Sequence, residues 1–276
     1  MPMIVLCLVQ LMLVLDDTVV SVALPSIRDE LGFSASELPW VVNAYFLAFG
    51  GLLLLCGRMA DLLGRRRVFL IGVALFGVAS LACGLAQELW QLVIGRFVQG
   101  SGSAMASPPA MSMITLLYPE ARERARALGI WGGIAALGGT SGLVLSGALT
   151  DLASWRWIFL INLPVVAVTL ALLPRLIPES RAPGRRRLDV PGATLITGAA
   201  VSLVYGLLRA GEEGWGDHLV IGAVVLSAAL AVAFLAAESR AGRLWFRARS
   251  WRRGPVRSPT ARPCCSRWRC TRWRSC

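Results

Sequence analysis

The stretch GRMADLLGRRR, at residues 57–67, lies between two long apolar runs and sets the architecture around it. The first run extends from residue 39 to residue 56, and the second from residue 68 to residue 86. At 1.5 Å per residue, a helix of either length reaches roughly across the ~30 Å hydrocarbon core of a bilayer. The stretch is therefore a short, charged connection between two predicted membrane spans.

Apolar blocks of this kind recur along the chain. Hydrophobic residues make up 56% of the 276 residues, and the mean hydropathy is +0.64. Ordinary soluble domains contain roughly 45–50% apolar residues. Eight blocks are long enough to be spans, and they lie at residues 4–24, 39–56, 68–86, 90–117, 128–149, 157–174, 190–209 and 219–237. The sequence thus predicts an all-α, polytopic transmembrane helix bundle.

The arginines between the spans indicate the orientation. The connections around 57–67, 118–127 and 175–189 carry 4, 3 and 5 arginines, whereas the alternate connections carry only Arg28 and Arg156. Because cytoplasmic loops are enriched in basic residues, we expect the first set and both termini in the cytoplasm, and the protein in the plasma (cell inner) membrane. Tryptophans near the opposite ends of the spans fit an interfacial aromatic belt, namely Trp40, Trp90, Trp155, Trp157 and Trp215.

The net charge of +12 comes from the last part of the sequence. Residues 1–238 hold 16 arginines and 16 acidic residues, whereas residues 239–276 hold 12 arginines and no acid. No basic groove for nucleic acid is therefore expected. Residues 239–276 are rich in Arg, Trp and Cys and lack helical periodicity, so we expect this tail to be disordered or translated out of frame.

Residues that commonly carry catalysis are sparse. His218 is the only histidine, and the sequence contains no HExxH or GxSxG motif and no cysteines with the spacing of a zinc site. We therefore expect no enzymatic activity, no metal and no cofactor.

Charged residues inside membrane spans are costly and are candidates for function. Asp16 and Asp17 interrupt the first span, and Arg96 lies in the fourth. Asp16 lies roughly 12 Å and Arg96 roughly 9 Å from the outer ends of their spans, so the two are expected to meet. Asp17 points about 100° away from Asp16 and is not expected to share its partner. Two interpretations stay open: a site that couples protonation to conformation, or a static bridge that fixes helix packing.

Four motifs, in the same order along the chain, resemble those of the major facilitator superfamily, in particular its fourteen-span drug:proton antiporters. The 57–67 stretch is similar to the family signature between spans two and three. The segment LDDTVVSVALP at residues 15–25 resembles the first-span motif, with Asp16 at its acidic position. The fourth-span and fifth-span motifs are matched too, although Leu143 stands where proline is usual and Ser146 where glycine is usual. The matching residues are Gly57, Asp61, Gly64, Arg65 and Arg66 in the first of these stretches, Arg96, Gln99, Gly100 and Gly102 in the fourth span, and Gly138, Gly142, Ser146 and Gly147 in the fifth.

The resemblance implies a transporter that works by alternating access and exports amphipathic drugs or metabolites in exchange for protons. It implies that the proton gradient supplies the energy, and that the partners are a small amphipathic molecule, protons and the lipid bilayer. Asp16, Arg96 and Gln99 are then expected at the coupling site in the cavity, and residues 57–67 at a cytoplasmic gate whose usual partner lies in the second half of the transporter.

The same resemblance divides the chain into a six-helix half at residues 1–175, a basic cytoplasmic linker at 176–189, two inserted helices at 190–238 and the tail at 239–276. The alternative is an inactive truncated remnant, or an interaction protein, that lacks the second half.

Overall fold

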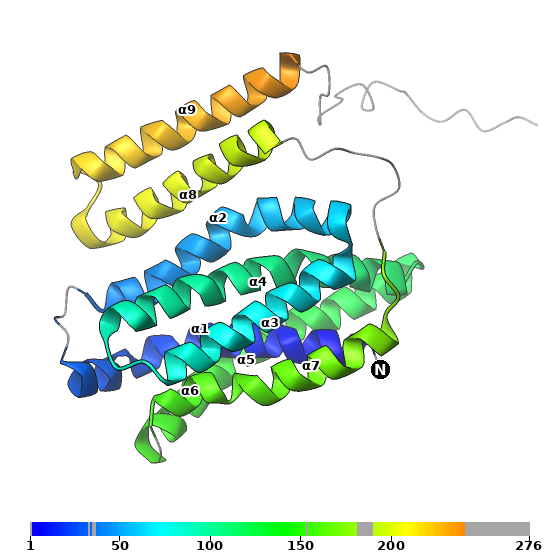
Figure 1. Cartoon of the computed structure of the whole chain (residues 1–276), viewed down its shortest axis with the longest axis horizontal. Helices are drawn as coiled ribbons and strands as arrows, with labels where there is room; N and C mark the ends of the chain where they lie inside the picture. Colours follow the sequence, from blue (N-terminus) through cyan, green and yellow to red (C-terminus); the bar gives the residue numbers. More distant parts are fainter. Residues whose placement is uncertain (1, 33, 35–36, 153, 181–189, 241–276) are drawn as a thin grey trace, which may run out of the picture. The chain divides into compact units, whose positions relative to one another are not determined.

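The computed structural model describes residues 2–32, 34, 37–152, 154–180 and 190–240. Within these residues the regular structure is helical, and no strand is present. The helices, shown in Figure 1, are α1 (Pro2–Leu31), α2 (Pro39–Leu63), α3 (Arg65–Gly84), α4 (Leu89–Leu117), α5 (Ala121–Leu152), α6 (Arg156–Leu160), α7 (Asn162–Leu176), α8 (Val190–Glu213) and α9 (His218–Arg240). Most of the predicted linker and nearly all of the predicted tail lie outside the described residues. The division into four domains stays a prediction.

The helices follow the predicted spans, and most extend beyond the apolar blocks. The sixth predicted span is divided at Ile161 into α6 and α7. Among the described residues, seven segments are long and apolar enough to cross a membrane, with α6 and α7 counted together. Helix α4 falls outside this set, since glycine, serine, proline and the polar pair Arg96 and Gln99 interrupt its apolar sequence. The all-α polytopic bundle predicted from the sequence is confirmed.

Small residues allow α4 to approach its neighbours closely. An added Cβ at Gly102 would lie 2.7 Å from the carbonyl oxygen of Gly72 on α3, and one at Gly100 would lie 2.3 Å from that of Tyr45 on α2. Because lipid provides no hydrophobic drive for helix association, such backbone contacts are what hold membrane helices together. Helices α2, α3 and α4 therefore form one tightly packed group.

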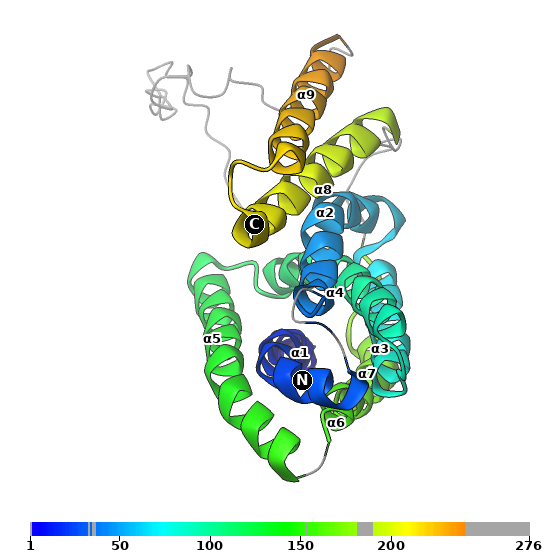
Figure 2. The same cartoon turned by 90° about the vertical axis from the view of Figure 1, so that its left-hand side faces the viewer.

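Helix α1 lies between this group and α5. Figure 2 shows α1 with α5 on one side and α3, α6 and α7 on the other. An added Cβ at Gly142 of α5 would lie 2.9 Å from the Cβ atom of Thr18, and one at Gly138 would lie 3.2 Å from side-chain atoms of Val14. The Ser146 hydroxyl donates a buried hydrogen bond to the Val19 carbonyl at 2.9 Å. The glycines and this bond together fix α5 against α1.

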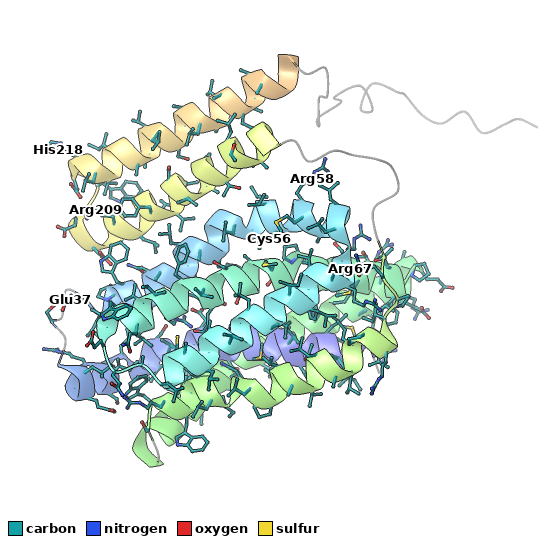
Figure 3. The ribbon with its side chains drawn as sticks, viewed as in Figure 1. Glu37, Cys56, Arg58, Arg67, Arg209 and His218 are labelled. Atoms are coloured by element: carbon teal, nitrogen blue, oxygen red, sulfur yellow. The ribbon has the colours of Figure 1, made fainter. Side chains whose placement is uncertain are left out.

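Charged residues lie at both ends of the bundle. Figure 3 shows Arg58 and Arg67 toward one end, and Glu37, Arg209 and His218 toward the other. The amino-terminal end of α1 lies at the same end as the connection between α2 and α3 (Figure 1). The start of α1 and the α2–α3 connection, which are both predicted to be cytoplasmic, thus lie at a common end of the helices.

Helix α8 packs against α2, and α9 packs against α8. An added Cβ at Gly51 would lie 2.4 Å from a methyl group of Val201, and Asn43 donates to Glu212 at 2.5 Å. The Ser227 hydroxyl on α9 donates to the Ala199 carbonyl at 2.8 Å. The described residues up to Ala237 belong to one compact unit.

Candidate functional site

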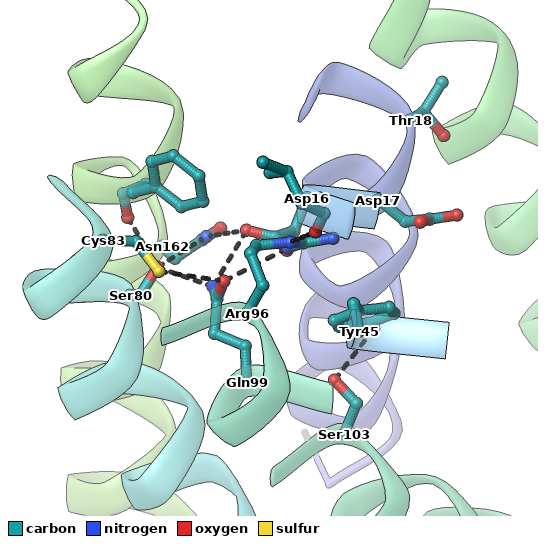
Figure 4. A network of polar contacts seen from close by, with 12 residues as sticks. Asp16, Asp17, Thr18, Tyr45, Ser80, Cys83, Arg96, Gln99, Ser103 and Asn162 are labelled. Atoms are coloured by element: carbon teal, nitrogen blue, oxygen red, sulfur yellow. Dashed lines mark hydrogen bonds and ion pairs between the residues drawn. The ribbon is translucent and has the colours of Figure 1, made fainter. Parts of the chain in front are cut away.

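A network of polar side chains is buried where α1, α3, α4 and α7 meet (Figure 4). At its centre, the side chains of Asp16 and Arg96 are both 0% exposed. Arg96 Nη1 donates to Asp16 Oδ2 at 2.5 Å. Helical spacing places Gln99 on the same face of α4 as Arg96, and Gln99 Nε2 donates to Asp16 Oδ1 at 3.1 Å. The structure brings the three predicted coupling residues together.

Two further residues complete the network. Asn162, at the start of α7, donates from Nδ2 to Asp16 Oδ1 at 2.8 Å and to Ser80 Oγ at 3.0 Å. Ser80 on α3 also accepts from Gln99 Nε2 at 3.1 Å and donates to the Phe159 carbonyl at 2.9 Å. A single carboxylate on α1 therefore accepts hydrogen bonds from both α4 and α7, and Ser80 connects the same donors to α3.

Arg96 also contacts α2. Its Nε donates to the Val41 carbonyl at 3.2 Å, and its guanidinium carbon lies 4.3 Å from the centre of the Tyr45 ring. The Tyr45 hydroxyl donates to Ser103 on α4 at 2.9 Å. Within the described residues, Arg96 Nη2 is buried without a hydrogen-bond partner. The guanidinium is thus held by charge, by hydrogen bonds and by a cation–π contact, and one of its nitrogens, Nη2, has no described partner.

The buried ion pair can respond to a proton. Two charges taken out of water are stabilised only while they remain paired and hydrogen-bonded. Among the described residues, Asp16 is the only carboxylate in ion-pair contact with Arg96. A proton on Asp16 removes that pairing and weakens the charge-assisted hydrogen bonds from three side chains. The arrangement can therefore link the protonation of one carboxylate to the packing of three helices.

Sequence reasoning found Asp16, Arg96 and Gln99 but missed Asn162, Ser80 and Tyr45. Asn162 carried a usable signal, because an amide in an apolar block needs a buried partner. Ser80 carried none, since a serine in a helix usually bonds to its own backbone.

The 57–67 stretch forms a second polar cluster. Asp61 was predicted to lie in the connection, which is wrong: α2 continues to Leu63 and places Asp61 in its last turn. There it pairs with Arg65, with Nη2 and Oδ1 3.0 Å apart. The chain turns at Gly64, whose φ of 116° strongly favours glycine. The connection is therefore one residue long.

Glu179, which follows α7, is the main partner of this turn and was not predicted. Its carboxylate accepts from the backbone N–H groups of Arg66 and Arg67, each at 3.1 Å, and lies within 3.8 Å of both guanidinium groups. An added Cβ at Gly64 would lie 2.5 Å from Glu179 Oε1. The backbone N–H of Arg65 also donates to the Ser180 carbonyl at 3.0 Å. The stretch expected to act as a gate is thus already bound by the segment that follows α7, at the start of the predicted linker.

The other motif glycines differ in their surroundings. An added Cβ at Gly57 would make only ordinary contact with Pro108, at 3.5 Å. One at Gly147 would meet no described atom within 4 Å, unlike those at Gly138 and Gly142. Ser146, which departs from the usual motif, contributes the hydrogen bond to α1.

Membrane-length helices, a charged network buried among them and a charged turn at one end together define a polytopic membrane protein. Among the described residues, no group of three or more His, Cys, Asp or Glu side chains is placed to hold a metal ion. Residues 6–248 match the Major Facilitator Superfamily. The chain belongs to this superfamily.

Curated relatives include drug resistance and export proteins. The chain is 44% identical over 239 residues to puromycin resistance protein pur8 of Streptomyces alboniger, covering 86% of this chain and 47% of that protein. It is 44% identical over 238 residues to cephamycin export protein CmcT of Amycolatopsis lactamdurans, covering 85% and 49%. It is 41% identical over 204 residues to multidrug resistance protein Stp of Mycobacterium tuberculosis, covering 74% and 38%. The chain spans about half the length of the first two relatives.

Solved structures share the fold. The proton:xylose symporter XylE has a TM-score of 0.56 at 19% identity, covering 83% of this chain and 52% of that chain. A bacterial homologue of the human lysosomal transporter Spinster has a TM-score of 0.54 at 22% identity, covering 84% and 58%. At these identities the likeness concerns the fold alone.

Proposed function

We propose that this chain serves the proton-coupled export of amphipathic drugs or metabolites by alternating access. The observation that carries the proposal is the Asp16 carboxylate, fully buried against Arg96 and Gln99 inside a bundle of membrane-length helices. Intramembrane ionisable groups of this kind mark ion and substrate pathways. The names of the relatives, which are export and resistance proteins rather than enzymes, support the direction and the substrate class.

In this proposal, Asp16 carries the coupled proton. The ionised carboxylate holds Arg96, Gln99 and Asn162, and so keeps α1, α4 and α7 in one arrangement. When Asp16 is protonated, Arg96 remains charged and loses its pairing. The contacts among the three helices then weaken, which favours a second arrangement of the half and supplies the energetic link that alternating access requires.

We propose that the protein lies in the plasma membrane, with the turn at Gly64 and both termini on the cytoplasmic side. The arginines of the connections at 57–67 and 118–127 support it, because such residues are retained on the cytoplasmic side. In this orientation, the cluster around Glu179 lies at the cytoplasmic end and serves as part of a gate.

Transport by the chain in inside-out membrane vesicles tests the proposal. With an imposed gradient, acidic inside, wild-type vesicles are expected to accumulate a fluorescent amphipathic dye, and Asp16→Asn is expected to abolish accumulation. Asp29→Asn is the matched control, because Asp29 is an exposed acid near the outer end of the same helix. Undiminished accumulation by Asp16→Asn contradicts the proton role. Absence of transport by the wild-type 276-residue chain contradicts the proposal for this chain and favours the non-transporting alternative.

A further inference from the structure

The Asp16 carboxyl group needs different hydrogen-bond partners in its two protonation states. When ionised it only accepts hydrogen bonds, whereas the protonated group also carries an O–H donor. A buried polar group without a partner costs free energy, so this O–H needs an acceptor within the network. Oδ2 faces the Arg96 cation at 2.5 Å, which leaves Oδ1 as the atom that takes the proton. The acceptor therefore has to lie beside Oδ1.

Most acceptor atoms of the network are already in use. The Arg96 side chain has no acceptor. The Gln99 side-chain oxygen accepts from Arg96 Nη1 at 3.1 Å and from Cys83 Sγ at 3.6 Å. Ser80 Oγ accepts from the amides of Gln99 and Asn162 and donates to a backbone carbonyl, which uses the full capacity of a hydroxyl group. Neither Gln99 nor Ser80 can accept from a further O–H without losing a bond that it already makes.

The side-chain oxygen of Asn162 is the exception. Both hydrogen bonds of this side chain come from Nδ2, to Asp16 Oδ1 at 2.8 Å and to Ser80 Oγ at 3.0 Å. Among the described residues, no hydrogen bond is made to Asn162 Oδ1. Figure 4 shows the amide directed toward Asp16, and the residue is 3% exposed. Because an amide carries its donors and its acceptor on opposite sides, a half-turn about its terminal torsion exchanges the two.

The backbone around Asn162 is fixed, so the amide can turn without moving its helix. Asn162 is the first residue of α7. The Ser80 hydroxyl on α3 holds the Phe159 carbonyl just before it, at 2.9 Å. An added Cβ at Gly77 of α3 would lie 2.7 Å from a methyl group of Val166, so α7 also packs tightly against α3 after this point. The side chain is thereby kept beside Asp16.

We infer that Asn162 is a positioning residue that bonds to Asp16 in both of its protonation states. Nδ2 donates to the ionised carboxylate, and after a half-turn of the amide Oδ1 accepts from the Asp16 O–H. The proton forms an O–H bond with Asp16 Oδ1, and Asn162 itself gains and loses no proton. The inference rests on the proposed function and adds which contact survives protonation. Helix α1 stays bonded to α7, whereas its pairing with Arg96 on α4 is lost.

The other titratable groups near Asp16 do not take over this role. They are Asp17 on α1, Tyr45 on α2, Cys83 on α3 and Arg96 on α4. Residues 128–149 of α5 and 162–174 of α7 contain no titratable residue. Tyrosine and cysteine keep their protons at and below neutral pH, and arginine stays charged. On acidification, the change at this site is therefore confined to the carboxyl groups of α1.

Infrared difference spectra of the purified 276-residue chain in detergent micelles, taken between neutral and acidic pH, test the inference. Protonation of Asp16 is expected to give a carboxylic C=O band that is absent from Asp16→Asn. In Asn162→Leu this band is expected to shift to higher frequency, because the O–H has lost its acceptor. Asn43→Leu is the matched control: it removes the only other asparagine, whose amide donates to Glu212, and is expected to leave the band unchanged.

An isotope label follows Asn162 directly and does not depend on the folding of an Asn162 variant. In the Asn43→Leu chain, asparagine with a carbon-13 side-chain amide places the label at Asn162 alone. The labelled amide band is expected to shift on acidification, with the same midpoint as the Asp16 carboxylic band. A contact that serves only for packing would not follow this titration.

The two ways in which the inference can fail are distinct from failure of the proposed function. It is overturned if the Asp16 band forms while the labelled amide band stays unchanged, or if Asn162→Leu leaves the Asp16 band at the wild-type frequency. In both cases the proton role of Asp16 stands. Absence of any band that depends on Asp16 overturns the inference together with that proton role.

Discussion

Gly100 on α4 lies directly against the backbone of α2, and its replacement by alanine tests whether this close contact between the two helices exists. An added Cβ at residue 100 would lie 2.3 Å from the Tyr45 carbonyl oxygen and 3.0 Å from Tyr45 Cα. Favourable contacts begin at about 3.5 Å, so α2 has to move away by about 1 Å. The partner atoms are backbone, which side-chain rotation cannot relieve.

The cost follows from the contacts that this movement disturbs. Overpacking of a tight contact costs about 1–3 kcal/mol, and each interhelical hydrogen bond in a membrane protein contributes about 0.6 kcal/mol. The bonds at risk are Arg96 Nε to the Val41 carbonyl, at 3.2 Å, and the Tyr45 hydroxyl to Ser103, at 2.9 Å. We expect Gly100→Ala to lower the free energy of unfolding by about 2–4 kcal/mol in total.

Unfolding of the purified chain by SDS, followed by tryptophan fluorescence, measures this change. Gly139→Ala on α5 is the control, because an added Cβ at residue 139 meets no described atom within 4 Å. It is expected to be neutral or stabilising by up to about 1 kcal/mol, since alanine favours the helix. If Gly100→Ala is as stable as Gly139→Ala, the close contact between α2 and α4 does not exist as described.

Three further predictions concern separate contacts. Glu179→Ala is expected to lower the free energy of unfolding by about 1–2 kcal/mol, because the first amides of α3 lose their acceptor. Hydrogen exchange of these amides is expected to become faster. Unchanged exchange would show that the turn does not depend on Glu179. Ser146→Ala is expected to cost only about 0.6 kcal/mol in the same SDS titration, since it removes one hydrogen bond to Val19, and a loss above about 2 kcal/mol would indicate a larger role. The hydrogen bond from Arg209, with a second from the Leu219 amide, holds the pKa of Asp217 below its usual value. This pairing stabilises the connection between α8 and α9 above the ordinary Asp pKa of about 4 and is lost as the pH falls through the lowered value. A carbon-13 NMR titration should show the Asp217 pKa rising in Arg209→Gln, and an unchanged pKa would exclude the pairing.

The sequence alone was sufficient to predict the bundle and the centre of its polar network. Both predictions rest on features that can be read directly along the sequence. These are the length of the apolar blocks and the presence of charged residues within them, which are costly in hydrocarbon. The depths of Asp16 and Arg96 followed from the rise of a helix, so their meeting was predictable.

The contacts that sequence reasoning missed depend on packing between distant segments. Asn162 reaches Asp16 across 146 residues, and Glu179 reaches Arg66 across 113. The hydrophobic periodicity of one segment does not indicate which distant loop contacts the end of that helix. The predicted position of Asp61 was wrong for a different reason. The apolar block ends at residue 56, but the helix α2 continues to Leu63, because a charged side chain does not by itself end a helix.

Proton release on ligand binding tests the central claim, that Asp16 exchanges a proton as part of transport. The purified chain is mixed with tetraphenylphosphonium in weakly buffered detergent solution near pH 7, and a pH indicator reports the protons released. The account predicts release by the wild type and by Asp29→Asn, and none by Asp16→Asn, which has no carboxyl group at that position. Equal release by Asp16→Asn and the wild type would contradict it, as would binding without release by the wild type, which is the behaviour of a static Asp16–Arg96 bridge.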